Sequence, residues 1–435
     1  MFVIYSEKES PRLSYVLQYI FGDLCGTEFL LTTDIDTYKS TEGLKINYSE
    51  RRMSGEEFYI EACPFLFDNN LNPCKVGVAD FEGTKALFPQ KETTDFPFDI
   101  FSAVFYMLSR YEEYQPFIKD THGRFKPTES LAYKNGFLNK PVVNIWVKHF
   151  FRRIELKYNC ELKLNTPRYS FINTIDIDIA YSFSHKGFYR NFFGYVRSLL
   201  YGRFDEILQR TKVLGGTLSD PFDSYDFIID TLQKYRLNTV FFVHVGDYGI
   251  YDKNVPYKNN KFRDLIRYLA DYAEIGIHPS YESSNREDKL QEEIERLSEI
   301  IRKDITKSRQ HFLRLNFPQT YRQLINNKIK EDFSLGFASE IGFRAGVCTP
   351  FRFFDLDTNK STTLVIRPFS FMEGTLKDYM NKRIDESLGI IENQILEVRN
   401  VGGEFISLWH NESLGNDGRW EGWKEVYEKM VQWAV

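Results

Sequence analysis

Downstream of residue 165, short apolar segments alternate regularly with longer amphipathic ones. The apolar segments have the length of strands and lie at residues 170–176, 238–245, 274–279, 309–315, 332–338, 363–369 and 404–410. Apolar residues three and four positions apart predict helices between most of them, at 224–235, 261–272, 287–302 and 375–398. Alternating strands and helices specify a parallel sheet, and about seven repeats predict a distorted (β/α)7-type barrel, with a doubly wound open sheet as the alternative.

The first 165 residues have a less regular pattern, which predicts a smaller α/β domain. Ser10 and Pro11 supply an N-cap and a first-turn proline for a helix. Strand-like and helical segments follow one another at residues 2–6, 28–33, 44–48, 98–114 and 142–156. A chain of 435 residues favours two domains, and we place them at 1–165 and 166–435. No chemistry motif marks the first domain, whose role we leave open; His122 and His149 are interpreted as structural.

Composition and charge narrow the function classes. The net charge of −5 lacks the basic footprint of a protein that binds nucleic acid or anionic lipid. No apolar stretch approaches the roughly 20 residues of a membrane-spanning helix, and the N-terminus does not read as a secretory signal. The five cysteines lack CxxC spacing, which indicates reduced thiols. We therefore predict a cytoplasmic protein without a membrane span or a nucleic-acid partner.

Ionisable side chains gather where predicted strands end. Asp176 and Asp178 close the first strand and project to one side of it, because strand side chains alternate. His278 ends the third predicted strand, and Glu282 follows four residues later. His410 ends the last strand, between large apolar residues. Such groups can hold a divalent cation and exchange protons with a substrate, although each motif alone is more often structural.

Together these segments resemble the polysaccharide deacetylase (NodB-homology) family of carbohydrate esterases, in its branch with a DxD first motif. The resemblance runs in the family's order over about residues 168–415. The family's first motif, TFDDG, is similar to residues 174–178, and its second, EIGNHTxSH, to residues 274–282. Its Arg-containing third motif is similar to residues 309–314 and its acidic fourth motif to Glu340. Its fifth motif, Leu-x-His, is similar to residues 408–410. The resemblance implies a NodB-like barrel.

The family's mechanism assigns roles to these residues. Asp178 and His278 would bind a divalent metal that activates water, with zinc favoured and cobalt, nickel or manganese as alternatives. Asp176 would accept the proton of the water, and His410 would protonate the leaving group. The implied substrate is an N-acetylated sugar or oligosaccharide, in surface polysaccharide synthesis, with an O-acetyl ester as the alternative bond.

Two departures from the family pattern leave the third metal ligand open. Ile177 separates the two aspartates, and Glu282 stands where a second metal histidine is expected. Glu282, His311 or neither of them completes the set. Candidates for substrate contact or for support of the site are Arg309, Arg314, Glu340, Arg344 and Trp409. The replaced histidine also motivates a rival hypothesis, a catalytically inactive barrel that binds carbohydrate or serves as a scaffold.

Residues 183–203, which are rich in Phe, Tyr and Arg, interrupt the barrel pattern after the first strand. We interpret them as a lid, as an aromatic platform for sugars or as an insert that binds a partner. Oligomeric state is not addressed by these patterns.

Overall fold

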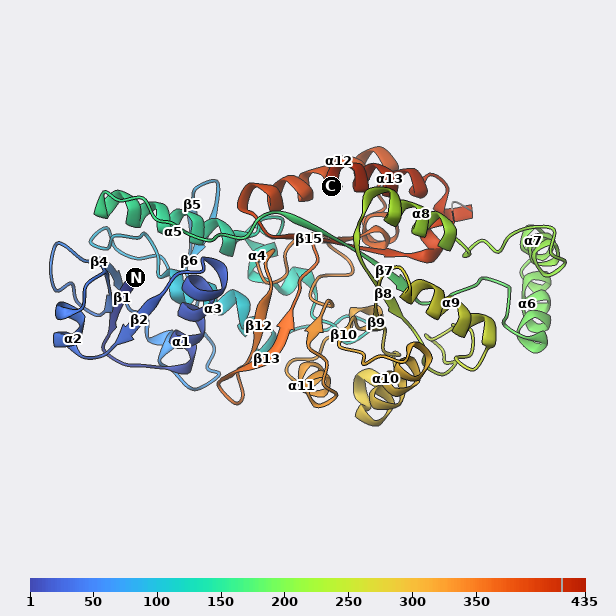
Figure 1. The fold of residues 1–435 in the computed structure, drawn as a ribbon, viewed down its shortest axis with the longest axis horizontal. Coiled ribbons are helices and arrows are strands. Elements are labelled where there is room, and N and C mark those ends of the chain that lie inside the picture. The colour runs from blue at the N-terminus through green and yellow to red at the C-terminus, as the bar shows by residue number, and fades with distance from the viewer. Residues whose placement is uncertain (416–417) are drawn as a thin grey trace.

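The computed structural model describes residues 1–415 and 418–435. Its N-terminal part is built on a four-stranded parallel sheet of order β2-β1-β3-β4 among the described residues (Figure 1). The side chain of Ser10 accepts a hydrogen bond from the Leu13 N–H at the start of the first helix, as predicted. The elements of this part are β1 (Phe2–Ser6), α1 (Pro11–Leu17), β2 (Phe29–Thr32), α2 (Ile35–Ser40), β3 (Leu44–Ser49), β4 (Phe58–Glu61), β5 (Val78–Phe81), β6 (Thr84–Leu87), α3 (Ile100–Leu108), α4 (Leu131–Lys134) and α5 (Val142–Tyr158).

The larger part contains a nine-stranded sheet of order β12-β13-β11-β10-β9-β8-β7-β15-β14, counted over the described chain. All neighbours are parallel except β12 and β13. Its strands are β7 (Ser170–Ile177), β8 (Asn238–Val243), β9 (Glu274–Ile277), β10 (Lys307–Ser308), β11 (Glu331–Asp332), β12 (Phe351–Asp355), β13 (Lys360–Ile366), β14 (Phe371–Met372) and β15 (Glu404–His410). The helices that connect or cover them are α8 (Tyr225–Tyr235), α9 (Asn260–Ala270), α10 (Glu287–Ile301), α11 (Gln319–Asn326), α12 (Ile384–Val401) and α13 (Trp423–Ala434).

This sheet curls into a distorted barrel, as predicted. Its concave side encloses a small apolar cluster of Ile172, Val240, Phe242, Leu313, Phe333, Ala338, Phe369, Met372, Ile406 and Leu408. Backbone hydrogen bonds from Phe369 N–H to Leu335 O (3.3 Å) and from Gly342 N–H to Ser370 O (2.7 Å) join the segment after β11 to the segment that leads into β14. The barrel is therefore closed partly by irregular chain rather than by a complete ladder.

Three of the predicted elements differ from the structure. The predicted strands 309–315 and 332–338 are wrong: the observed strands β10 and β11 lie at 307–308 and 331–332, and the predicted residues after them are irregular, with left-handed backbone angles at Phe312 and Leu313. The predicted helix 375–398 is interrupted before α12, and Asn381 is left-handed (φ 50°) at the break. The antiparallel edge strand β12 was not predicted.

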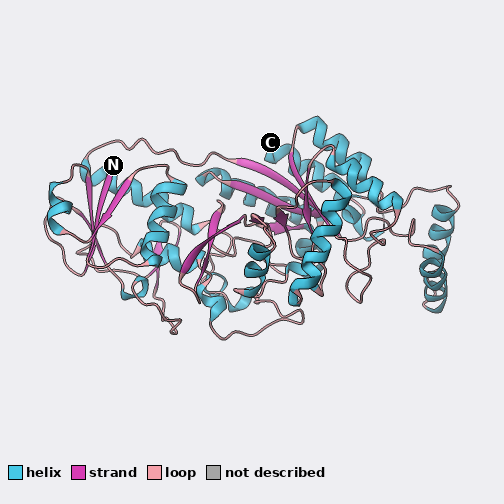
Figure 2. Cartoon of the chain, turned by 60° about the horizontal axis from the view of Figure 1, so that its bottom comes forward, coloured by secondary structure: helices cyan, strands magenta, loops and turns pink. Residues whose placement is uncertain are grey.

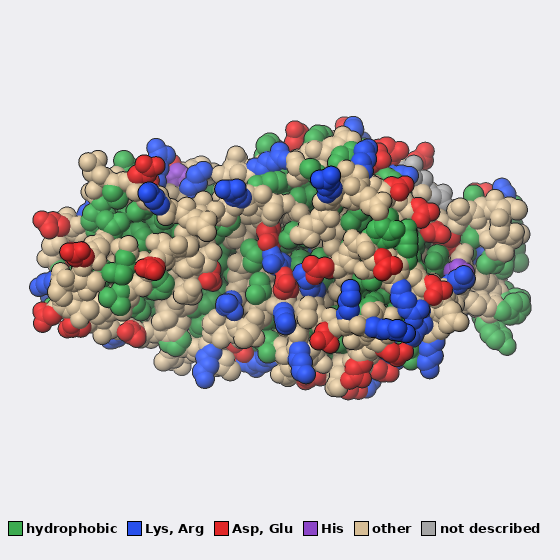
Figure 3. All heavy atoms as spheres, viewed as in Figure 1, with side chains coloured by type: hydrophobic (Ala, Val, Ile, Leu, Met, Phe, Trp, Pro, Cys, Tyr) green, Lys and Arg blue, Asp and Glu red, His purple; other side chains and the backbone are tan. Residues whose placement is uncertain are grey.

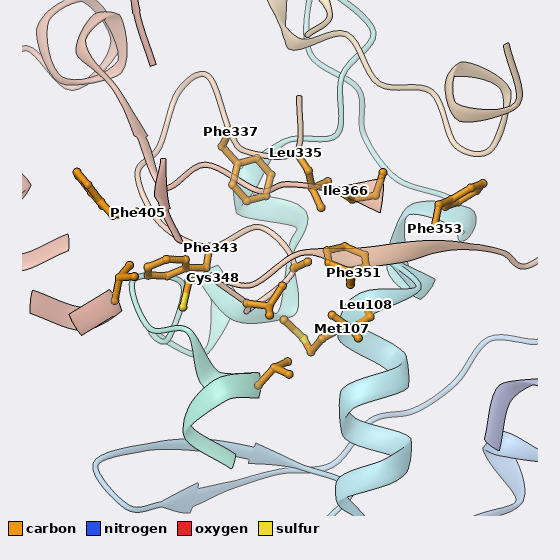
Figure 4. Close-up of a cluster of buried hydrophobic side chains, with 14 of the residues drawn as sticks. Met107, Leu108, Leu335, Phe337, Phe343, Cys348, Phe351, Phe353, Ile366 and Phe405 are labelled. Atoms are coloured by element: carbon orange, nitrogen blue, oxygen red, sulfur yellow. The ribbon is translucent and has the colours of Figure 1, made fainter. Parts of the chain in front are cut away.

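The two parts of the chain share one continuous hydrophobic core. Figure 4 shows Met107 and Leu108 of α3 beside Phe351 and Ile366 of the large sheet. An ion pair between Arg344 and Glu113 crosses the same boundary, and both side chains are buried. Glu113 also accepts a hydrogen bond from Arg110 Nε (2.8 Å). Burial alone would raise the pKa of Glu113, but the charges of Arg344 and Arg110 hold it below its usual value.

A hairpin of two helices, α6 (Phe188–Leu200) and α7 (Phe204–Leu214), stands apart from this body. It projects from one end of the molecule in both ribbon views (Figures 1 and 2). Among the described residues, no helix is long and apolar enough to cross a membrane.

We expect Glu113→Ala to lower the free energy of unfolding by about 3–5 kcal/mol, because it leaves Arg344 buried without its carboxylate. Denaturant titration followed by circular dichroism measures the change. Asp288→Ala, which removes an exposed partner of Arg286, serves as the control and should change stability little. Equal effects of the two substitutions would contradict a structural role for the buried pair.

Candidate metal centre and catalytic cleft

The carboxyl ends of β7, β9 and β15 meet at one edge of the barrel. The parallel pairing of β7 with β15 sets His410 beside Asp176, and the His278 N–H bonds to Val243 O at the end of β8 (3.0 Å). Strand alternation directs Asp176, Asp178 and His410 into a cleft of about 440 Å³. The other residues that line the cleft are Arg124, His278, Gln310, His311, Phe312, Leu313, Ala338, Met372, Gly374, Asp378, Tyr379, Leu408, Glu412, Arg419 and Trp420.

Asp178, His278 and His311 form a group whose ligand atoms lie within 4.8 Å of one another. Asp178 Oδ1 is 3.0 Å from His278 Nε2, and Asp178 Oδ2 is 3.3 Å from His311 Nε2. The Nδ1 atom of His278 bonds to the carbonyl of Arg309 (2.6 Å), so in the neutral ring Nε2 carries a lone pair. Two acceptors therefore face each other, and Asp178 Oδ1 has no hydrogen-bond partner among the described residues. A cation satisfies this arrangement.

A carboxylate orients the second imidazole. His311 Nδ1 lies 2.9 Å from Asp252 Oδ1, which turns Nε2 toward Asp178. Burial would lower the pKa of His311, but Asp178 and Asp252 raise it to about 9. Burial would likewise raise the pKa of Asp178, but the neighbouring histidines, led by His311, hold it well below its usual value. Each partner thus favours the charged form of the other.

The charge balance of the site also favours a cation. Asp176, Asp252 and Glu373 adjoin the cluster, and Arg309 pairs with Asp176 (2.9 Å). A bound divalent ion would replace the proton of His311 between Asp178 and Asp252 and supply the positive charge in its place. Two imidazoles and a carboxylate are a common donor set for zinc.

A second group, His244 with Asp252 and His311, adjoins the first. His244 is fully buried and does not line the cleft. Its Nδ1 atom contacts the carbonyl of His278 (3.1 Å), and burial lowers its pKa to about 4. We interpret His244 as a neutral residue that contacts His278 and Asp252 from outside the cleft and holds them in place.

Two further pairs flank the candidate metal cluster. Arg309 is completely buried; its Nη1 atom donates to Asp176 Oδ1 (2.9 Å) and to the Thr174 hydroxyl (2.6 Å). On the other side, His410 Nδ1 lies 2.7 Å from Glu373 Oε1, and His410 Nε2 faces the cleft, 3.7 Å from Asp178 Oδ2. Burial would lower the pKa of His410, but the charges of Glu373 and Asp178 raise it well above its usual value.

The other predicted residues lie further from the cluster. Glu282 is exposed and pairs with Arg286 (3.1 Å), because the chain enters a 3-10 turn after it, so its assignment as a ligand is corrected. Arg314 donates to the carbonyls of His122 (3.0 Å) and Tyr281 (2.7 Å). Glu340 lines an adjoining cleft rather than this one, and Arg344 is bound to Glu113.

The assignment of Trp409 to the cleft is also corrected. It is completely buried on the opposite side of β15 from His410, where it packs on Trp423 and Tyr427 of α13. It therefore supports the sheet from outside and cannot contact a ligand in the cleft. Strand alternation alone predicts this side.

Sequence reasoning missed Glu373 and Asp252. Glu373 follows the two-residue strand β14, which is too short for its periodicity to be recognised. Asp252 lies in an irregular loop, far along the chain from His311. The only sequence indication is the presence of isolated acidic residues in otherwise apolar or aromatic surroundings.

The first part of the chain reaches the cleft. Arg124 lines it, held by Asp120 (2.7 Å) and by a bond from Nη1 to the Phe312 carbonyl (2.7 Å). His122, interpreted as structural, bonds through Nδ1 with the Tyr281 hydroxyl (3.3 Å) and packs on Phe312. Residues 119–128 line an adjoining cleft of about 630 Å³ that shares Arg124, Leu313, Ala338 and Tyr379 with the first.

Comparisons with known proteins agree with this architecture only at a distance. Residues 2–159 match a family of unknown function, DUF7033, and no curated protein matches the chain. A protein from Mycobacterium smegmatis assigned as a polysaccharide deacetylase is 15% identical, with a TM-score of 0.40, and the match covers 61% of this chain and 83% of that one. The polysaccharide deacetylase Bc1974 from Bacillus cereus is 11% identical (TM-score 0.30; 60% and 86% covered). The carbohydrate deacetylase Agd3 is 9% identical (TM-score 0.39; 100% and 83% covered). Similarities this low carry no argument about activity.

We expect His311→Ala to weaken zinc binding by about 100-fold or more, because loss of a metal ligand costs more affinity than loss of a residue that only orients a ligand. Metal analysis of the purified protein and titration with zinc measure it. Glu282→Ala is the matched control, since the sequence alone allowed either residue as ligand. A larger loss with Glu282→Ala than with His311→Ala would overturn the assigned cluster.

Proposed function

We propose that this chain is a metal-dependent deacetylase of N-acetylated saccharides. The observation that carries the proposal is the buried, unsatisfied Oδ1 atom of the half-buried Asp178 beside two imidazoles, placed between the Asp176–Arg309 and His410–Glu373 pairs. A metal cluster flanked by one carboxylate and one histidine is the set of groups that hydrolysis of an amide needs. The resemblance of the strand-end motifs to polysaccharide deacetylases supports the same reaction.

Asp178, His278 and His311 would hold the ion. The chemistry that a divalent ion supplies when bound is Lewis acidity, which polarises a carbonyl oxygen and makes a nearby water more acidic. We favour zinc because two of the three ligands are imidazoles. Asp252 and the Arg309 carbonyl keep the two rings oriented through their Nδ1 atoms.

Asp176 is the proposed general base. Its Oδ2 atom lies 3.8 Å from His278 Nε2, beside the metal ligands, whereas Oδ1 is held by Arg309. The guanidinium fixes the carboxylate, which accepts the proton of the attacking water. Arg309 is a positioning residue, because Asp176 separates it from the reacting atoms.

His410 is the proposed general acid. The bond to Glu373 holds the ring and favours the protonated imidazolium, so Nε2 can donate a proton to the leaving amine. Glu373 itself is completely buried and acts only through His410.

The substrate assignment rests on the walls of the cleft. Phe312 and Trp420 offer aromatic faces, and Arg124, Asp378 and Arg419 offer hydrogen-bonding groups for hydroxyls. The adjoining cleft at residues 119–128 extends the available space in one direction, which suits an oligosaccharide better than a single sugar. An N-acetyl amide is the proposed bond, and an O-acetyl ester would use the same groups. The cytoplasmic location and a role in surface polysaccharide synthesis remain predictions.

The exposed position of Glu282 removes the observation that motivated the rival hypothesis, and the inactive carbohydrate-binding or scaffold barrel stays a prediction. It rested on the replacement of a metal histidine, and His311 offers an imidazole from a neighbouring loop.

We expect Asp176→Asn to lower kcat by about 10²–10⁴-fold while the protein keeps its metal, because the amide cannot accept the proton. Acetate release from N-acetylated glucosamine oligosaccharides measures turnover, and metal analysis of the same sample gives occupancy. Asp226→Asn, on α8 away from the cleft, is the matched control. A wild-type protein that holds metal but releases no acetate from N- or O-acetylated sugars would contradict the proposal.

We expect Glu373→Gln to move the alkaline limb of the kcat/KM profile to lower pH. Removing the carboxylate removes the charge that raises the pKa of His410, so the ring loses its proton at a lower pH. The measurement is the pH dependence of acetate release by the metal-loaded enzyme. An unchanged alkaline limb would remove His410 from the role of general acid.

A further inference from the structure

The α6–α7 hairpin has its apolar and polar faces reversed relative to an ordinary helical hairpin. Asn191 and Ser198 of α6 are buried, and the α6 backbone at Gly194 lies so close to Arg210 of α7 that a Cβ there would meet the guanidinium at 2.5 Å. Arg210 donates to Asn191 Oδ1 (3.0 Å) and to Glu206 Oε1 (2.9 Å). The Arg210–Asn191 bond and the contact of the Tyr195 and Thr211 hydroxyls (3.0 Å) join the two helices, whereas Glu206 lies on α7 itself.

The large apolar residues of α6 face solvent instead. Phe188, Phe192, Val196 and Leu199 recur four and three positions apart, which aligns them on one side of the helix. The exposed set on α6 consists of Phe188, Tyr189, Phe192, Phe193, Val196, Leu199 and Leu200, whose exposures range from 39% to 79%. We call this set the α6 apolar face. Apolar side chains appear on this hairpin in the space-filling view (Figure 3).

Basic residues border this face. Lys186, Arg190, Arg197 and Arg203 lie between residues 179 and 204, and no acidic residue occurs in that interval. Arg190 is anchored to the body through the Asn254 carbonyl (2.7 Å), and Arg197 and Arg203 are exposed. The net charge of −5 for the whole chain therefore hides a local cationic segment. An apolar helical face with aromatic and leucine side chains and adjacent arginines is the pattern of a helix that lies in a membrane interface.

We propose that the α6 apolar face binds the surface of a bilayer that contains anionic phospholipids. A helix of 13 residues extends about 20 Å, which is too short to span the hydrocarbon core, so α6 would lie in the plane of the membrane. Its phenylalanine and leucine side chains would enter the acyl boundary, and the arginines would contact headgroup phosphates. A second copy of the chain suits the face less well, because a symmetric contact would bring the arginines of both copies together.

The hairpin leaves the barrel on the same edge as the cleft, so membrane binding would bring the bilayer to that edge. It follows Asp178 in the chain and leaves the barrel at the edge where the catalytic strands end. Membrane binding itself does not depend on the proposed reaction. Only its consequence rests on the proposed function: a bilayer-bound enzyme would act on a saccharide carried by a lipid.

The test is sedimentation of the full-length protein with vesicles of phosphatidylcholine, with and without phosphatidylglycerol. We expect binding to the anionic vesicles that weakens as salt is added. The double substitution Phe193→Ser and Leu200→Ser should weaken it by about tenfold or more, because both side chains leave water on binding. Both residues are exposed, so circular dichroism should show an unchanged fold.

The matched control is Ile118→Ser with Leu156→Ser, which removes two apolar residues of similar exposure from the first part of the chain. It should leave vesicle binding unchanged, and acetate release from a soluble substrate, measured separately, should be the same in both variants. Absence of wild-type binding, or equal binding by the hairpin variant, would overturn the proposal. So would a dimer in light scattering that the hairpin substitutions convert to a monomer, because the face would then be covered by a second copy.

Discussion

The central constraint in this molecule is the gathering of carboxylates at one edge of the barrel, with Asp176 and Glu373 buried and Asp178 half-buried. Asp176, Asp178 and Glu373 lie within a few ångströms of His278 and His410, and Asp178 keeps an oxygen without a hydrogen-bond partner among the described residues. A buried charge is tolerated only when it is paired or bound to a metal. The single guanidinium of Arg309 neutralises one carboxylate. The need for further positive charge explains why the surrounding imidazoles point their Nε2 atoms at the same spot, and why the pKa of His410 is held high.

The irregular part of the barrel is what makes this arrangement possible. The residues of the predicted strand 309–315 follow β10 as irregular chain, and His311–Leu313 form a 3-10 turn. The strand has ended at Ser308, and in the turn that follows, with left-handed Phe312 and Leu313, His311 Nε2 lies 3.3 Å from Asp178. Arg309 meanwhile crosses the barrel interior, with its guanidinium over the Phe242 ring (4.5 Å) and near Phe369 (5.6 Å). The same irregular segment after β10 therefore both ends the strand and supplies His311 to the site.

How much of this could be predicted depends on the origin of each residue. Asp176, Asp178, His278 and His410 lie at or directly after strand ends, and strand ends follow from hydrophobic periodicity, so their meeting could be predicted. The Glu282 assignment failed because it relied on counting residues past a strand, where a 3-10 turn redirects the chain. Glu373 and Asp252 could not be found, since their partners are distant in sequence and no periodicity marks them. The wrong placement of Trp409 in the cleft was avoidable, because neighbouring residues on a strand face opposite sides and His410 already faces the cleft.

The first part of the chain also belongs to the argument about the site, although no motif marked it. Arg124 bonds to the Phe312 carbonyl, and Arg314 bonds to the carbonyl of His122, so the loop at 119–128 is attached to the segment that carries His311. The same loop lines the adjoining cleft. Behind it, the buried Glu113–Arg344 pair and the shared apolar core hold the two parts in one position. A barrel expressed without residues 1–165 would lose this wall and expose that core. The chain therefore acts as one structural unit, in which the N-terminal part shapes the cleft that the barrel's ionisable residues occupy.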